Sequence, residues 1–220
     1  MTVIGDHPRL RYHEGCLAAH ALNVIGDRWA LLVVRELMLK PKRFQALRAG
    51  LPGITAGVLT QRLNQLAAAG VLEHDPDLGT YALTASGRAL LPVLIALCRW
   101  GSQHPGHDPA RFISPTALML SMTANIDHAT AAAHPLVAGM VSGRETFTLR
   151  PDDSGDLQVA PALQHGRDFT LTGTGNELAS AVYGPRSLAA LLAEGLIAID
   201  GDIAAAQAFA DLFHLRPTSC

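Results

Sequence analysis

The chain has 220 residues, of which 49% are apolar and 16% charged, which is enough apolar content for one large or two small globular domains. No apolar run reaches the roughly 18 to 20 residues of a membrane span, and the first residues lack the apolar stretch of a signal peptide. The net charge of −2 excludes a strongly basic protein, and we expect a cytoplasmic chain without a membrane partner.

The charge is divided unevenly along the sequence. Residues 1–105 contain eleven basic and seven acidic side chains, whereas residues 106–220 contain six basic and twelve acidic ones. A basic excess confined to one half suits a polyanionic partner for that half alone. The alternative interpretation is a chance asymmetry between two surfaces.

The apolar spacing at the start of the chain predicts two helices and a short third one. Steps of three and four residues favour a helix from Cys16 that Gly26 interrupts. A second helix, capped by Asp27, stops before Pro41, and residues 43–49 continue as a short helix.

The next segment has the pattern of a helix-turn-helix. Residues 50–53 form a turn, and Thr55 caps an amphipathic helix over residues 56–69 that ends at Gly70. A short helix, a tight turn and a longer helix in this order are typical of a unit that places its second helix in a DNA groove.

A predicted hairpin follows the longer helix directly, as the wing of a winged helix does. Its strands cover residues 71–74 and 80–83, and the turn between them begins at Asp75. Thr84 then caps a helix over residues 85–100.

Turn-forming residues at 101–109 predict a linker to a second domain. Beyond it, Ser114 and Pro115 begin a helix. The remaining pattern predicts antiparallel strands within residues 136–163, strands at 168–172 and 195–199, and helices at 176–183, 186–194 and 203–214, the last capped by Asp202. We therefore expect an α+β protein.

Residues 12–101 resemble the HxlR family of bacterial winged-helix regulators. The shared residues, specific as a set, are Cys16, residues 25–29, 31–37 and 42–44, Leu47, residues 51–55 and 58–63, Leu66, residues 70–72 and 81–84, Gly87 and Trp100. The resemblance implies a homodimer built through the first and last helices of this region. The sequence departs from the family at Gly57, where a basic or larger residue is usual, and in its acidic wing.

Residues 114–214 resemble sterol-carrier-protein domains. The residues that carry this likeness are 168–172, Leu178, Leu188, residues 195–202, Ala205, Phe209, Leu212 and Phe213. The resemblance implies helices over a sheet that enclose an apolar cavity. We accordingly expect residues 1–105 to form a DNA-binding and dimerisation domain and residues 106–220 a ligand-binding domain.

The predicted DNA site is the helix that Thr55 caps, because Gln and Asn can pair with adenine, Arg with guanine, and Thr with a thymine methyl group. Cations at its flank can hold phosphates. The candidate residues are Lys42, Arg43, Thr55, Gly57, Thr60, Gln61, Arg62 and Asn64. The alternative is that these side chains form only the solvated face of an amphipathic helix.

The predicted ligand site is a set of apolar side chains in the second domain, among which methionines suit an adaptable pocket. The candidates are Leu118, Met122, Met140, Phe147, Phe169, Tyr183, Leu188 and Leu192. A packed core requires the same residue types, and the sequence does not separate the two interpretations.

The cysteines and histidines carry weaker signals. Cys16 matches a thiol position that some HxlR-type regulators use for redox sensing, but a buried structural cysteine is the better interpretation. We interpret Cys98 as a core residue and Cys220 as part of a free tail. His104 and His107 in the linker lack converging partners, so we expect no metal, and no motif indicates an enzyme or a cofactor.

The favoured hypothesis is a homodimeric regulator that binds double-stranded DNA and is modulated by a small apolar effector. One alternative is an apolar-ligand carrier or sensor that uses the winged helix only for dimerisation. Another is a thiol-based redox regulator that acts through Cys16.

Overall fold

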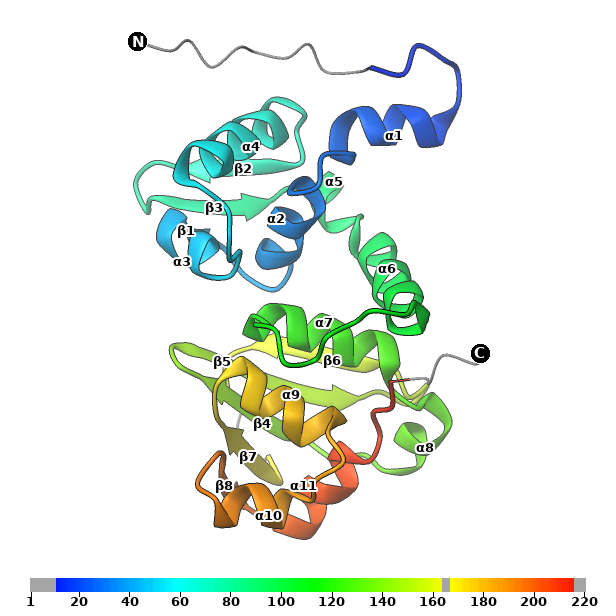
Figure 1. Cartoon of the computed structure of the whole chain (residues 1–220), viewed down its shortest axis with the longest axis vertical. Coiled ribbons are helices and arrows are strands. Elements are labelled where there is room, and N and C mark those ends of the chain that lie inside the picture. Colours follow the sequence, from blue (N-terminus) through cyan, green and yellow to red (C-terminus); the bar gives the residue numbers. More distant parts are fainter. Residues whose placement is uncertain (1–10, 164–166, 216–220) are drawn as a thin grey trace.

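The computed structural model describes residues 11–163 and 167–215, and its secondary structure forms two bodies stacked along the long axis (Figure 1). Each body has its own cluster of buried apolar side chains. The mixture of helices with two separate sheets confirms the predicted α+β class. The predicted boundary between the domains at residue 105 stays a prediction. Leu120, beyond that boundary, packs into the apolar cluster of the first half.

The first half has the predicted order of helices followed by a hairpin. Its three strands form an antiparallel sheet in the order β1-β3-β2. The elements are α1 (Leu17–Ile25), α2 (Ala30–Leu37), β1 (Lys42–Arg43), α3 (Phe44–Ala49), α4 (Ala56–Ala68), β2 (Leu72–Asp75), β3 (Thr80–Leu83), α5 (Ala85–Arg88) and α6 (Leu91–Gln103).

Two details of the first half differ from the sequence prediction. The helix predicted over residues 85–100 is two helices, since Pro92 starts a new helix and cannot continue the preceding one. The two-residue strand β1, which pairs with β3, is too short to have a sequence pattern. Helix α6 also extends into the predicted linker, as far as Gln103.

The start of α4 is fixed by its cap, as predicted. The hydroxyl of Thr55 accepts a hydrogen bond from the backbone N–H of Val58 at 3.3 Å, and Gly70 beyond the helix has a φ of 70°. Removing a threonine cap leaves an N–H group of the first turn without its partner.

Replacing Thr55 with alanine is therefore expected to lower the free energy of unfolding by about 1 kcal/mol. Thr60 is exposed on the same helix and caps nothing, so Thr60→Ala is the matched control. Urea denaturation of both variants is the measurement, and equal effects of the two substitutions would contradict the role of the cap.

The second half is a five-stranded sheet with helices over one face (Figure 1). The strand order is β6-β5-β4-β7-β8, in which only the β4–β7 pair is parallel. The elements are α7 (Pro115–Asn125), α8 (His128–Ala133), β4 (Ala138–Ser142), β5 (Glu145–Pro151), β6 (Leu157–Pro161), β7 (Phe169–Thr172), α9 (Gly175–Tyr183), α10 (Leu188–Ala193), β8 (Ala198–Gly201) and α11 (Ile203–Ala210). Helix α8 was not predicted.

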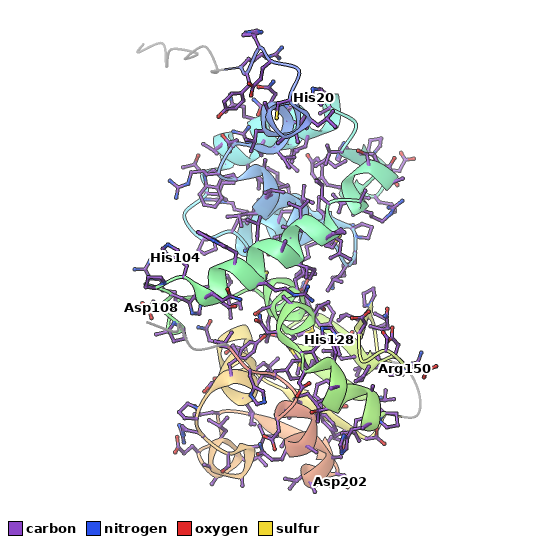
Figure 2. All side chains as sticks on the ribbon, turned by 90° about the vertical axis from the view of Figure 1, so that its right-hand side faces the viewer. His20, His104, Asp108, His128, Arg150 and Asp202 are labelled. Atoms are coloured by element: carbon purple, nitrogen blue, oxygen red, sulfur yellow. The ribbon has the colours of Figure 1, made fainter. Side chains whose placement is uncertain are left out.

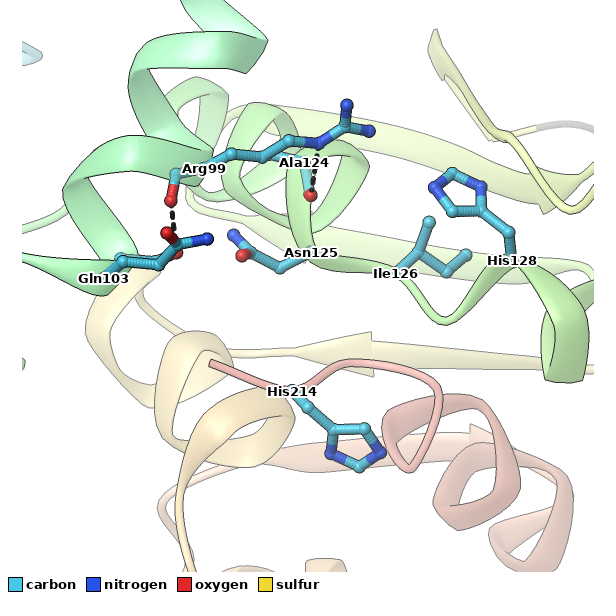
Figure 3. Close-up of a pocket in the computed structure, with 8 residues that line it drawn as sticks. Arg99, Gln103, Ala124, Asn125, Ile126, His128 and His214 are labelled. Atoms are coloured by element: carbon cyan, nitrogen blue, oxygen red, sulfur yellow. Dashed lines mark hydrogen bonds between the residues drawn. The ribbon is translucent and has the colours of Figure 1, made fainter. Parts of the chain in front are cut away.

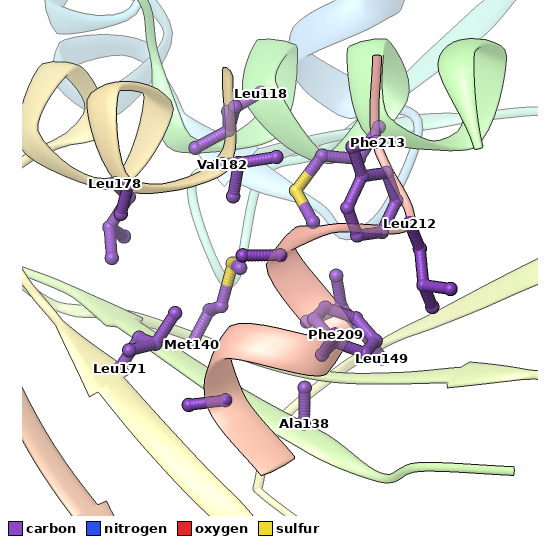
Figure 4. Close-up of a cluster of buried hydrophobic side chains, with 14 of the residues drawn as sticks. Leu118, Ala138, Met140, Leu149, Leu171, Leu178, Val182, Phe209, Leu212 and Phe213 are labelled. Atoms are coloured by element: carbon purple, nitrogen blue, oxygen red, sulfur yellow. The ribbon is translucent and has the colours of Figure 1, made fainter. Parts of the chain in front are cut away.

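The expected ligand-binding side chains form the packed core of this half (Figure 4). Leu118, Met122, Met140, Phe147, Phe169 and Leu188 are at most 1% exposed, while Tyr183 and Leu192 pack against their cluster. Two pockets, of about 390 and about 220 Å³, are lined by other residues, and none of the eight expected ligand-binding residues lines either one. In this structure these side chains therefore form a packed core. A ligand pocket that opens within this core stays a prediction.

Among residues 11–163 and 167–215, no single helix is long and apolar enough to span a membrane. Helices α1 and α2 reach the required length and composition only together, and they meet at an angle of 77°.

Candidate nucleic-acid interface

The exposed face of α4 presents three of the predicted base-reading side chains together. Thr60, Gln61 and Asn64 point to solvent, whereas Leu59 and Leu63 are at most 1% exposed and attach the helix to the core. Within the described chain, no hydrogen bond occupies the side chains of these three residues. The amide and hydroxyl groups are thus available to an external partner, as a groove-reading helix requires.

The N-terminal end of α4 is also open. A Cβ atom at Gly57 would meet no atom within 4 Å, so the fold does not require glycine there. Thr55 is exposed, although its hydroxyl is engaged as the helix cap. The space above Gly57 allows another backbone or base edge to approach closely.

Arg62 does not belong to this face, which corrects the sequence interpretation. Its side chain is 8% exposed and forms an ion pair with Asp27 at 2.5 Å between Nη2 and Oδ2. It also donates to Gln65, so it attaches α4 to the turn between α1 and α2. The reason is helical spacing, because position 62 follows Leu59 by three residues and precedes Leu66 by four.

Lys42 is likewise removed from the predicted phosphate contacts. It is 5% exposed, and its ammonium group lies 3.0 Å from a carboxylate oxygen of Glu36 and 3.0 Å from one of Glu145. It also donates to the hydroxyl of Thr116 at 2.9 Å. Three partners satisfy the three N–H bonds of a lysine, so Lys42 joins the two halves instead of binding DNA.

Glu36 is the centre of this buried network. Its carboxylate is 0% exposed and accepts hydrogen bonds from Arg35 at 2.8 Å and from Ser114 at 2.6 Å, besides Lys42. Arg35 also donates to the carbonyl of Gly50. Gly50 itself packs on the carboxylate, since a Cβ atom added to it would lie 2.4 Å from Glu36 Oε2. The turn before α4 therefore packs directly on the ionic junction of the two halves.

Two arginines beside α3 remain exposed. Arg43 keeps its predicted accessibility, and Arg48 on the last turn of α3 was missing from the predicted site. Within the ranges that the structure describes, neither one forms a salt bridge. Both suit phosphate contacts next to a groove-reading helix. In the sequence, its positive charge is the only signal that identifies Arg48 as a candidate for phosphate contact.

The wing is exposed and acidic, as the sequence indicates. Asp75 accepts hydrogen bonds from the backbone of Asp77 and Leu78, which orders the tip. Arg88, which follows the wing, donates one guanidinium N–H to the carbonyl of Leu83 at 2.5 Å. The acidic tip disfavours a close approach to phosphates.

Cys16 is exposed, which contradicts its interpretation as a buried structural cysteine. Cys98 is only partly exposed, and burial raises the pKa of its thiol, so the expected core position suits it better. Cys220 lies outside the described residues. The described part of the chain contains no group of three or more residues suited to hold a metal ion.

An apolar surface covers parts of α1 and α6. Leu17 is 85% exposed and Leu22 50% on α1, while Leu97 is 45% and Trp100 64% exposed on α6. These are the first and last helices of the region for which the sequence resemblance implies dimerisation. Large exposed apolar side chains are typical of interaction surfaces.

The comparisons with known proteins match the two halves of the chain to two different families. Residues 24–109 match the HxlR-like helix-turn-helix family, and residues 134–214 match the SCP-2 sterol transfer family. An uncharacterized HTH-type transcriptional regulator of Synechocystis sp. is 38% identical over 107 residues, which cover 46% of this chain and 79% of that protein. One of Methanothermobacter thermautotrophicus is 33% identical over 98 residues, covering 42% and 75%.

Among solved structures, the quinone-bound YodB of B. subtilis is 31% identical, with a TM-score of 0.37. The match covers 40% of this chain and 97% of that one.

Proposed function

This chain belongs to the HxlR-like helix-turn-helix family of transcriptional regulators, and from that membership we propose that it binds operator DNA as a homodimer through α4 and responds to an apolar ligand in its second half. The observation that carries the DNA part is the exposed face of α4. There Thr60, Gln61 and Asn64 are exposed, and Arg43 and Arg48 of the preceding segment are exposed as well. Such a face can read base edges in the major groove while arginines hold the flanking phosphates.

The salt dependence of DNA binding tests this proposal. Each neutralised phosphate releases condensed counterions, so affinity for the DNA upstream of the gene should fall steeply as salt rises. A gel-shift titration at several salt concentrations, with random duplex as the competitor, is the measurement. Flat salt dependence, or equal affinity for random duplex, would count against a sequence-specific regulator.

We place the dimer contact on the apolar surface of α1 and α6. A twofold pair would present its two α4 helices to successive major grooves, about 34 Å apart. Trp100→Glu puts a charge on that surface and is expected to convert the dimer to monomers in analytical ultracentrifugation. Ile203, 51% exposed on α11, supplies the control Ile203→Glu, which should leave the dimer intact. A dimer that survives Trp100→Glu unchanged would place the contact elsewhere.

The ligand part rests on the match of residues 134–214 to the SCP-2 sterol transfer family. The core there includes Met119, Met122 and Met140, whose flexible side chains repack easily around an apolar guest. A ligand would part the helices from the sheet and thereby shift the spacing of the two α4 helices. Native mass spectrometry of the purified chain tests this part, and a protein that carries no guest and takes up no lipid would refute it.

A second candidate function is an apolar-ligand carrier whose winged helix serves dimerisation alone. The acidic wing and the burial of Lys42 and Arg62 favour it, because they remove positive charge from the surface that would face DNA. Replacing Gln61 and Asn64 on α4 by alanine separates the two candidate functions.

A further inference from the structure

A pocket lies between the end of α6 and the second half of the chain (Figure 3). Its volume of about 390 Å³ falls in the range of small-molecule sites, roughly 300 to 1,000 Å³. Three separate segments line it, namely the end of α6, the turn between α7 and α8, and the residue after Phe213. The lining residues are Arg99, Ser102, Gln103, Ala124, Asn125, Ile126, His128 and His214.

Backbone hydrogen bonds hold two of these segments together. The N–H of Asp127 donates to the carbonyl of Leu212 at 2.8 Å, and the N–H of His214 donates to that of Asn125 at 3.3 Å. Ile126 and Phe213 form an antiparallel bridge between these bonds. The floor of the pocket is thus built from paired backbone and does not depend on a loose loop.

Arg99 is the only lining residue with a permanent charge. Its Nε donates to the carbonyl of Ala124 at 3.0 Å, which fixes the side chain against α7. In Figure 3 the guanidinium extends on the side of His128. Of its nitrogens, only Nε has a partner in the part of the chain that the structure describes, so the terminal amino groups are left to a guest.

The other lining residues carry no negative charge, and all of them except Ala124 and Ile126 have polar side chains. Gln103 and His214 have no side-chain hydrogen bond within the described ranges. Asp156 pairs with the lining residue His128 at 3.1 Å, and Asp127 binds the hydroxyl and backbone of Thr130. Among the lining residues themselves, none is acidic and Arg99 has no ion pair within the described ranges.

We propose that this pocket binds a small polar oxyanion, a carboxylate or a phosphate, through the terminal amino groups of Arg99. A planar guanidinium recognises such groups with two parallel hydrogen bonds. Gln103, Asn125 and Ser102 suit hydroxyl groups on the same molecule. The site is distinct from the apolar core of the second half, and its ligand would connect α6 to the turn between α7 and α8.

Isothermal titration calorimetry with inorganic phosphate and, separately, with succinate tests the proposal and distinguishes the two chemistries. We expect one saturable site per chain for at least one probe. Arg99→Gln should weaken that binding by about tenfold or more. Arg150→Gln removes an exposed arginine outside the pocket and should change it by less than about twofold.

Arg99 also donates to the carbonyl of Ala124 on α7, so Arg99→Gln alone could weaken binding by disturbing the fold. A second variant separates these two causes. Gln103→Glu leaves the bond from Arg99 to Ala124 in place but puts a negative charge in the lining, and it should also weaken binding by about tenfold. No saturable binding of either probe, or binding that Gln103→Glu leaves unchanged, would overturn the proposal.

Discussion

Replacing Lys42 with methionine is expected to lower the free energy of unfolding by about 3 kcal/mol. The substitution removes the ammonium group that lies between Glu36, which is 0% exposed, and Glu145. Glu36 then stays buried with Arg35 as its remaining cationic neighbour, and Glu145, whose side chain is 18% exposed, keeps Lys40. Breaking one side of a buried pair is costly because the remaining charge cannot recover its hydration.

Lys40 provides the matched control for this prediction. It pairs with the same oxygen of Glu145 at 3.3 Å but is 28% exposed, so Lys40→Met should cost less than about 1 kcal/mol. Urea denaturation followed by circular dichroism gives both values. Adding Glu145→Gln to the Lys42→Met chain should restore part of the loss. Equal effects of the two lysine substitutions would show that burial of the network contributes little.

The joint replacement of Gln61 and Asn64 by alanine is expected to reduce operator affinity by roughly 100-fold, because each amide paired with a base is worth about 1 to 3 kcal/mol. Both side chains are exposed on α4 and make no hydrogen bond inside the described chain, so stability should change little. A fluorescence-anisotropy titration with labelled operator is the measurement.

The control for this pair is Gln158→Ala on β6. It removes an exposed amide whose hydrogen bond goes to Asp152, in the other half of the molecule. Operator affinity should then stay within about twofold of the unsubstituted chain. A doubly substituted α4 that still binds the operator normally, with the dimer intact, would favour the carrier function over the regulator.

Local signals in the sequence were sufficient for most helices of the described chain. Thr55, Thr84 and Asp202 cap the helices that they were predicted to cap, because a cap depends on residues within one turn. The predicted cap Asp27 is wrong, since α2 begins later, after Trp29. Pro92 is an equally local signal for the break between α5 and α6. The continuous apolar pattern across it favours one long helix, and the structure has two.

The position of Lys42 was beyond local reasoning. Thr116 and Glu145, two of its partners, lie 74 and 103 positions further along the chain, in the second half. Its neighbours in sequence gave it the pattern of a surface cation before a helix-turn-helix. Arg62 was different, since its spacing from Leu59 and Leu66 already marked the buried side of α4. The residue type of Arg62 favours contact with DNA, its spacing favours burial, and the structure follows the spacing.

A regulator of the proposed kind inserts α4 into the major groove of DNA. Dimethyl sulfate footprinting detects this insertion, because the reagent methylates the N7 atom of guanine, which lies in the major groove. We predict two protected clusters about 10 base pairs apart, one for each α4 of a dimer, and their loss when Gln61 and Asn64 are replaced by alanine. DNA that the protein binds but whose guanines stay fully reactive would contradict insertion of α4 into the major groove. Protection that the double substitution leaves unchanged would contradict it as well.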